Sequence, residues 1–210
     1  MRKYIRLALY LIVTANISSA FAGPKEDYFK ALEIDAANVV SGLLLQGFDP
    51  NERDAQGQVG LYLALRSESW AVVDALLKHP GVQIDAVNAA GETPVMMAAL
   101  RGQVELTRRF LERGAQINRE GWTPLHYAAS SSEPGVVSLL LDRGAAIDAR
   151  SPNGTTPLMM AARYGAIDAA DLLRKRGADA SLRNERGLTA ADFALAAGRD
   201  TLAQRLQAAR

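Results

Sequence analysis

The sequence has no cysteine and only two histidines, His79 and His126, among its 210 residues. A chain without cysteine cannot form a disulfide, a thiol nucleophile or a cysteine-ligated metal site, although small exported proteins often rely on disulfides. A Ser/His/Asp triad would need one of the two histidines as its base. The lack of a thiol that could be misoxidised suits an oxidising compartment.

Sequence motifs for metals and nucleotides are also missing. No H-x-x-x-H, calcium-loop or glycine-rich phosphate-loop pattern occurs. The sequence therefore predicts no cofactor, no metal and no enzymatic activity. A hydrolase that uses acidic residues alone is the alternative, and it would need two buried carboxylates that line one pocket.

Long hydrophobic runs are scarce, and the one apolar stretch, Leu7–Ile17, is shorter than the roughly 20 residues that cross a bilayer. Three basic residues precede it, and an Ala-x-Ala pattern that ends at Ala22 follows it. This is the layout of a secretory signal peptide. We expect a signal peptide over residues 1–22, cleaved before Gly23 or alternatively before Phe21. A retained anchor is the competing interpretation.

Neither sign of charge dominates the chain. It has 24 basic and 23 acidic residues, and the expected leader holds three of the basic ones, which leaves 21 and 23, a net charge of −2. Nucleic-acid binders normally carry a clustered basic surface, and no long basic run occurs here. We expect no nucleic-acid partner, no membrane association after signal cleavage, and a periplasmic or secreted location.

Glycine, in contrast, is frequent and periodic. One series has spacings of 34, 30, 33 and 33 residues: Gly57, Gly91, Gly121, Gly154 and Gly187. A second series lies ten residues before the next member of the first, except at Gly114, which lies seven before Gly121: Gly47, Gly81, Gly114, Gly144 and Gly177. Such a period indicates a repeat architecture.

The repeated unit has a helix-turn-helix pattern. Thr93, Thr123 and Thr156 each precede a proline, so each threonine can cap a helix that begins at that proline. A second helix follows, for example Val104–Arg113 or Val136–Arg143. The second-series glycine is expected to end it in the left-handed conformation.

These motifs resemble the ankyrin repeat. Thr123-Pro124-Leu125-His126-Tyr127-Ala128-Ala129 matches the T-P-L-H-x-A-A core, and Gly-Ala closes three of the units. The resemblance implies an all-α ankyrin-repeat solenoid of helix-turn-helix units with β-turn fingers, about six repeats in all. We expect one domain over 23–210, with repeats at about 25–53 (degenerate), 54–87, 88–117, 118–150, 151–183 and 184–210 (a C-terminal cap).

The sequence departs from the repeat pattern at several places. The turn between Gly114 and Gly121 is three residues short, which predicts a stunted finger. Val59-Gly60 replaces Thr-Pro in the second unit. The two end repeats are expected to have a polar outer face, because an exposed apolar end would lower solubility.

Two sets of residues with chemical potential are better explained as structural. The resemblance implies that His126 ties the Thr-Pro turn by hydrogen bonding. The pairs Met96-Met97 and Met159-Met160 fall at one repeat position in the first helix, and we expect them to fill space there rather than to bind a soft metal.

Recognition is the better-supported function. In ankyrin stacks the variable residues lie on the finger tips and on the inner face of the first helices, where this chain also places Leu100, Ser130 and Ser131. Trp122 stands where the family usually has a polar residue, and aromatic residues and arginine dominate interface hot spots. A packing role over the short turn is the alternative for Trp122. The predicted partner-binding residues are Trp122, Tyr164, Arg163, Arg101, Arg119 and Arg150.

The sequence thus predicts a non-catalytic, monomeric module in the bacterial periplasm that binds another protein, as a scaffold or a partner-protecting protein. A secreted effector that binds a host protein is the alternative location and role.

Overall fold

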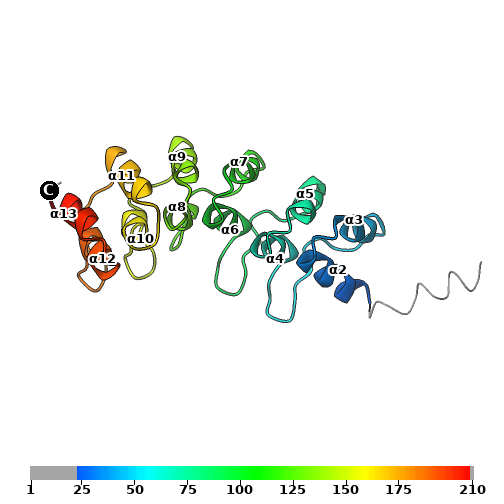
Figure 1. Cartoon of the computed structure of the whole chain (residues 1–210). Helices are drawn as coiled ribbons and strands as arrows, with labels where there is room; N and C mark the ends of the chain where they lie inside the picture. The colour runs from blue at the N-terminus through cyan, green and yellow to red at the C-terminus, as the bar shows by residue number, and fades with distance from the viewer. Residues whose placement is uncertain (1–22, 209–210) are drawn as a thin grey trace, which may run out of the picture. The chain divides into compact units, whose positions relative to one another are not determined.

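A computed structural model describes residues 23–208, so the expected signal peptide over residues 1–22 lies outside the described residues. The chain divides into two compact units, with the boundary between Val82 and Gln83. Within the described residues all regular elements are helices, and the extended pairing is a single bridge between Arg53 and Val59 (Figure 1). The predicted all-α repeat fold is therefore confirmed.

The first unit contains two helix pairs. Within each pair the two helices pack on each other, and α2 also packs on α4, as α3 does on α5. The helices are α2 (Pro24–Glu33), α3 (Ala37–Leu45), α4 (Gly60–Arg66) and α5 (Trp70–Lys78).

The second unit contains four helix pairs. Its first helices contact one another in the order α6, α8, α10, α12, and its second helices in the order α7, α9, α11, so two rows form (Figure 1). The helices are α6 (Pro94–Leu100), α7 (Val104–Glu112), α8 (Pro124–Ala129), α9 (Pro134–Asp142), α10 (Pro157–Arg163), α11 (Ile167–Lys175), α12 (Ala190–Ala196) and α13 (Asp200–Ala208).

The Thr-Pro prediction of helix starts is confirmed. Helices α6, α8 and α10 each begin at the proline, and the preceding threonine is the N-cap. The Oγ1 of Thr156 accepts a hydrogen bond from the Met159 amide at 3.4 Å. The proline costs nothing there, because its missing amide would have had no intrahelical partner.

The glycine prediction of helix ends holds at four of five positions. Gly47, Gly114, Gly144 and Gly177 have φ between 86° and 97°, the left-handed conformation that a Cβ disfavours. The prediction is wrong for Gly81: α5 ends at Lys78, and the C-cap His79 is extended, with ψ 125°. Pro80 is the cause, because a residue before proline is excluded from the helical region.

Gly60 replaces the repeat proline because another side chain occupies its space. A Cβ at Gly60 would lie 2.1 Å from the Tyr28 hydroxyl and 2.7 Å from its Cζ. Tyr28 of α2 is fully buried, and its hydroxyl donates to the Pro50 carbonyl at 2.9 Å. Burial, with the nearby Asp49 and Glu52 carboxylates, raises the pKa of Tyr28 far above its ordinary value. The phenol therefore stays neutral and keeps donating.

The two end repeats expose different kinds of residue. In α13, Leu202, Ala203 and Leu206 are buried while Gln204, Arg205 and Gln207 are exposed, as expected. At the other end α3 has no charged residue, Leu45 is 89% exposed and Ile34, just after α2, is 65% exposed. In the same repeat α2 exposes charged residues, among them Lys25, Glu26 and Lys30, so the expected polar surface is present on α2 and absent from α3.

The close contact between Tyr28 and Gly60 predicts opposite effects for two glycine-to-alanine substitutions in the first unit. Gly60→Ala should lower the free energy of unfolding by about 1–3 kcal/mol, because the methyl group overlaps the phenol ring. Gly42→Ala should raise it by about 0.5–1 kcal/mol, because Gly42 lies inside α3 with nothing within 4 Å of its Cβ position. Urea unfolding followed by circular dichroism measures both, and stabilisation by Gly60→Ala would contradict the assignment.

Candidate partner-binding site

The second unit has an apolar cavity of about 290 Å³ on its row of first helices. The three helices α6, α8 and α10 and the turn before α8 contribute to it. Its lining residues are Leu100, Trp122, His126, Tyr127, Ser130 and Met160. Trp122, the residue most strongly predicted to bind a partner, is therefore part of a concave site and is only partly buried.

The turn before Trp122 is shorter than the corresponding turn one repeat earlier. There Asp85, at the end of repeat two, accepts the Gln116 amide, and the finger of repeat three follows, closed by the hydrogen bond from the Asn88 amide to the Glu92 carbonyl. In repeat four Asn118 performs the linking task, because its side chain accepts from Ala146 and donates to Gly144.

The three residues that repeat four lacks are therefore missing from its finger. Trp122 lies four residues after its linking residue Asn118, whereas Glu92 lies seven after Asp85. Relative to the following helix the two residues are equivalent: Trp122 directly precedes the N-cap Thr123 of α8, as Glu92 directly precedes the N-cap Thr93 of α6. The indole therefore lies beside α8, behind a shorter loop.

Neighbouring side chains hold Trp122 in place. Its ring meets the rings of His126 and Tyr127 edge to face, with centroids 5.2 and 6.5 Å apart. The Tyr127 hydroxyl donates to Glu92 Oε1 at 2.8 Å, and Asn88 Nδ2 donates to Glu92 Oε2 at 2.8 Å. The finger of repeat three therefore fixes Tyr127, and Tyr127 in turn supports the indole.

His126 is structural, as predicted. It is fully buried, and its Nδ1 accepts from the Thr123 amide at 3.2 Å, so Nε2 carries the proton and donates to the Thr155 carbonyl at 3.0 Å. Burial lowers the pKa of His126 below 6.5, because a charged ring would lose its hydration there. Both ring nitrogens are engaged, so His126 links repeat four to repeat five and is not placed as a general base.

The other predicted site residues divide into two groups. Arg163 and Tyr164, at the end of α10, are exposed, and the Arg163 guanidinium lies 5.3 Å from the Tyr164 ring centroid. Arg101, the C-cap of α6, is also exposed. In contrast, Arg119 donates to the Gly91 carbonyl at 3.0 Å and Arg150 donates to the Arg183 carbonyl at 2.6 Å, so both tie neighbouring turns together.

Sequence reasoning missed part of the cavity lining. Met160 was expected only to fill space, as the buried Met96, Met97 and Met159 do. Tyr127 was not predicted to contribute to a site. Tyr127 and Met160 share the sixth position after the repeat glycine, and that shared position could have identified them. Ser131, expected on the inner face, is 4% exposed instead, because its carbonyl accepts the Ala166 amide.

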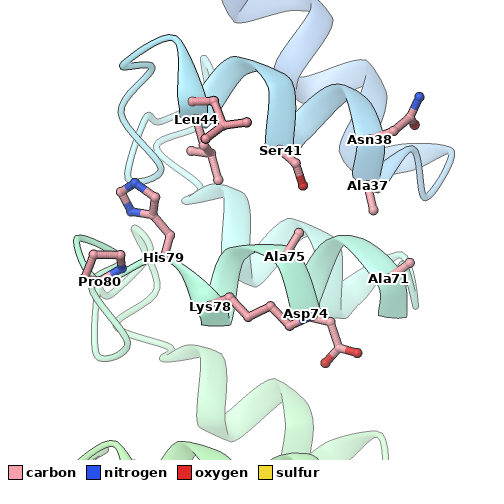
Figure 2. Close-up of a pocket in the computed structure, with 11 residues that line it drawn as sticks. Ala37, Asn38, Ser41, Leu44, Ala71, Asp74, Ala75, Lys78, His79 and Pro80 are labelled. Atoms are coloured by element: carbon pink, nitrogen blue, oxygen red, sulfur yellow. The ribbon is translucent and has the colours of Figure 1, made fainter.

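A separate groove of about 510 Å³ lies in the first unit between α3 and α5, and none of the predicted binding residues lines it (Figure 2). Its floor is made of small side chains, among them Ala37, Ser41, Ala71 and Ala75. Over residues 23–208, no cluster of three or more potential metal-ligating His, Asp or Glu side chains is present. In the same range no helix is long and apolar enough to cross a membrane.

Comparison with known families agrees with the fold. The family "Ankyrin repeats (3 copies)" matches residues 29–119 and 61–151, and "Ankyrin repeats (many copies)" matches residues 140–194. The chain belongs to the ankyrin-repeat family. This membership indicates a protein–protein interaction module.

Similar curated proteins match this chain over a small part of their own length. "Ankyrin repeat and SAM domain-containing protein 6" of Rattus norvegicus is 35% identical over 109 residues, which is 50% of this chain and 12% of that protein. "Putative palmitoyltransferase ZDHHC13" of Danio rerio is 31% identical over 123 residues, 56% of this chain and 19% of that protein. The match covers less than a fifth of either relative.

Burial of neutral His126 predicts a loss of stability in mild acid. The folded-state pKa is lower than the unfolded value near 6.5, so the unfolded chain binds more protons below pH 6.5. The wild-type free energy of unfolding should be constant above pH 6.5 and fall below it, by at most about 1.4 kcal/mol per pH unit until the folded-state pKa is reached.

Two variants isolate this contribution in urea unfolding at pH 7.5 and 5.5. His126→Gln should lose about 1–3 kcal/mol at pH 7.5, because the Thr155 carbonyl and the Thr123 amide lose their partner, and should depend less on pH. His79→Gln removes the other histidine and should keep the wild-type dependence. The same pH dependence in His126→Gln and wild type would rule out His126 as its source.

Proposed function

We propose that this protein is a non-catalytic binding module of the bacterial periplasm, acting as a monomer that holds or protects another protein. The partner contacts the row of first helices in the second unit, at the cavity around Trp122. The supporting observation is a partly exposed tryptophan whose ring is fixed by His126 and Tyr127 beside an apolar cavity. Rigid aromatic residues in desolvated pockets are typical of interface hot spots.

The periplasmic location is supported by the signal-peptide pattern of residues 1–22 and by the lack of cysteine. A secreted effector that binds a host protein would use the same leader, and is the alternative. Among the curated proteins a putative palmitoyltransferase matches this chain, but the similarity covers 19% of that protein, so its activity is not transferred here.

A hydrolase based on acidic residues is disfavoured by where the carboxylates lie. None of the buried polar side chains in the described part of the chain is an aspartate or glutamate. The partly buried Asp85, whose pKa is raised by burial, accepts the Gln116 amide in an inter-repeat loop. The pKa of exposed Asp179 is lowered by hydrogen bonds from Ser181. Asp85 and Asp179 therefore both accept hydrogen bonds within turns and loops, and neither lines the Trp122 cavity.

The proposal predicts that Trp122→Ala loses the partner while the fold remains. Loss of a hot-spot side chain should cost about 2 kcal/mol or more, about 30-fold in Kd. Residues 23–210, immobilised as bait in a periplasmic extract of the producing bacterium, should retain one protein that Trp122→Ala does not retain. Trp70→Ala is the matched control, because it removes the chain's other tryptophan, which lies in the first unit.

Thermal unfolding of all three baits separates lost binding from lost structure. If wild type, Trp70→Ala and Trp122→Ala retain the same protein, the binding function stands and the Trp122 site is wrong. If no bait retains any protein from either the periplasmic extract or a host extract, the proposed function is contradicted.

A further inference from the structure

The Trp122 cavity has walls that suit an apolar guest. Leu100, Met160 and the aromatic rings form its surface. Its polar groups are already used inside the protein: the Ser130 hydroxyl donates to the His126 carbonyl at 3.0 Å, and the Tyr127 hydroxyl donates to Glu92. A polar guest would lose its hydration there and find its potential partners engaged, which costs free energy.

The size of the cavity limits the guest further. Pockets for cofactors and drug-sized ligands have volumes of about 300–1,000 Å³. A volume of about 290 Å³, open between three helices, is at the lower limit of that range. It suits one large side chain inserted from a partner better than a whole small molecule.

The charges around the cavity are distributed unevenly. Arg101 directly follows the lining residue Leu100, Arg163 lies three residues after the lining residue Met160, and both are exposed at the C-terminal ends of their helices. The first helices of the second unit, with their C-caps, contain one carboxylate, Asp192, which is occupied by the amide and hydroxyl of Thr189 at 2.7 Å each. The exposed Glu133, the N-cap of α9, lies beside Gly102, so this side of the cavity carries two guanidinium groups and one carboxylate.

The opposite, turn side of the cavity carries charges of both signs. Glu92 lies at the turn before α6, where it holds Tyr127, the exposed Glu120 lies in the short turn before Trp122, and Arg119 donates to the Gly91 carbonyl. The excess of charge is therefore negative toward the turns, with two carboxylates and one guanidinium group, and positive toward the helix C-termini, with two guanidinium groups and one carboxylate. This distribution of charge favours one orientation of a bound partner segment over the reverse orientation.

We propose that the cavity binds a partner segment that inserts one large apolar side chain and carries aspartate or glutamate on the side facing Arg101 and Arg163. The inference rests on the proposed function and specifies the partner's chemistry at the same site. Trp122, Met160 and Leu100 bury the apolar anchor, and the two arginines attract and orient the acidic flank. The Arg163 guanidinium is held over the Tyr164 ring, which limits the entropy lost when it pairs.

Single-stranded nucleic acid also combines negative charge with groups that stack on tryptophan. The acidic residues on the turn side and the net charge of −2 after signal cleavage disfavour it. Nucleic acid therefore enters the experiment as a competing ligand.

Peptide titrations with a single tryptophan reporter test the proposal. In the Trp70→Phe background Trp122 is the one remaining tryptophan of the chain, so its fluorescence reports the cavity. The probes are short synthetic peptides with one central Phe, flanked by Asp, by Ser or by Lys, together with an Asp-flanked peptide whose central residue is Ala and an oligothymidine of matched charge.

The Asp-flanked Phe peptide should bind most tightly. Replacing its Phe by Ala should raise Kd about 30-fold or more, and added salt should weaken it more than the Ser-flanked peptide. Arg101→Gln and Arg163→Gln should each raise its Kd about two- to five-fold. Arg143→Gln, which removes an exposed charge at the end of α9 in the second-helix row, should leave Kd unchanged.

Three results would each overturn the inference: tighter binding of the Lys-flanked peptide, equal binding of the Ala peptide, or tighter binding of oligothymidine. Absence of binding by every peptide would also overturn it. The partner-capture experiment separates this failure from failure of the binding function: a captured protein that is lost on Trp122→Ala keeps the function and rejects only the predicted chemistry of the segment.

Discussion

Contact between neighbouring repeats is the constraint on which the rest of this structure depends. The helices have six to ten residues, too few to be stable alone in water, so each must bury its apolar face against the next pair. Ala98, Ala128 and Ala161, one on each of α6, α8 and α10, are fully buried, and their small side chains let these helices pack closely. Stability therefore accumulates from one interface to the next along the array.

The same constraint explains which changes the repeats accept. Repeat four has lost three residues from its finger, yet Asn118 keeps the link to the next loop and His126 keeps the hydrogen bond to Thr155. A finger that projects into solvent can shorten, because little apolar burial depends on it. The linking side chains cannot be lost so easily, since they satisfy backbone groups of the adjacent repeat.

Local signals predicted most of the fold, but one departure from the repeat depends on a residue far away in the sequence. Thr-Pro placed the helix starts correctly because capping is decided within a few residues. Gly81 failed because Pro80 ends α5 earlier, which the dipeptide itself could have shown. The reason for Gly60, in contrast, lies in Tyr28, 32 positions earlier in the chain. No local pattern reveals that a phenol ring occupies the space of the repeat proline.

The candidate site shows the same division. Trp122 could be identified from the sequence because it departs from its repeat position, but the hydrogen bond between Tyr127 and Glu92 joins residues 35 positions apart. The two arginines that tie neighbouring turns, Arg119 and Arg150, look no different in the sequence from Arg101 and Arg163. The contacts that Arg119 and Arg150 make depend on the stacking of turns, and that information is absent from composition and spacing.

The tryptophan of the candidate site is ordered before any partner binds. Trp122 directly precedes the N-cap of α8, the place that Glu92 holds before α6. The rings of His126 and Tyr127 fix the indole there, and Glu92 in turn holds Tyr127. A side chain that is already ordered loses little entropy on binding, so more of its apolar contact appears as affinity. The tryptophan that departs from the repeat pattern thus gives the second unit a preorganised apolar surface.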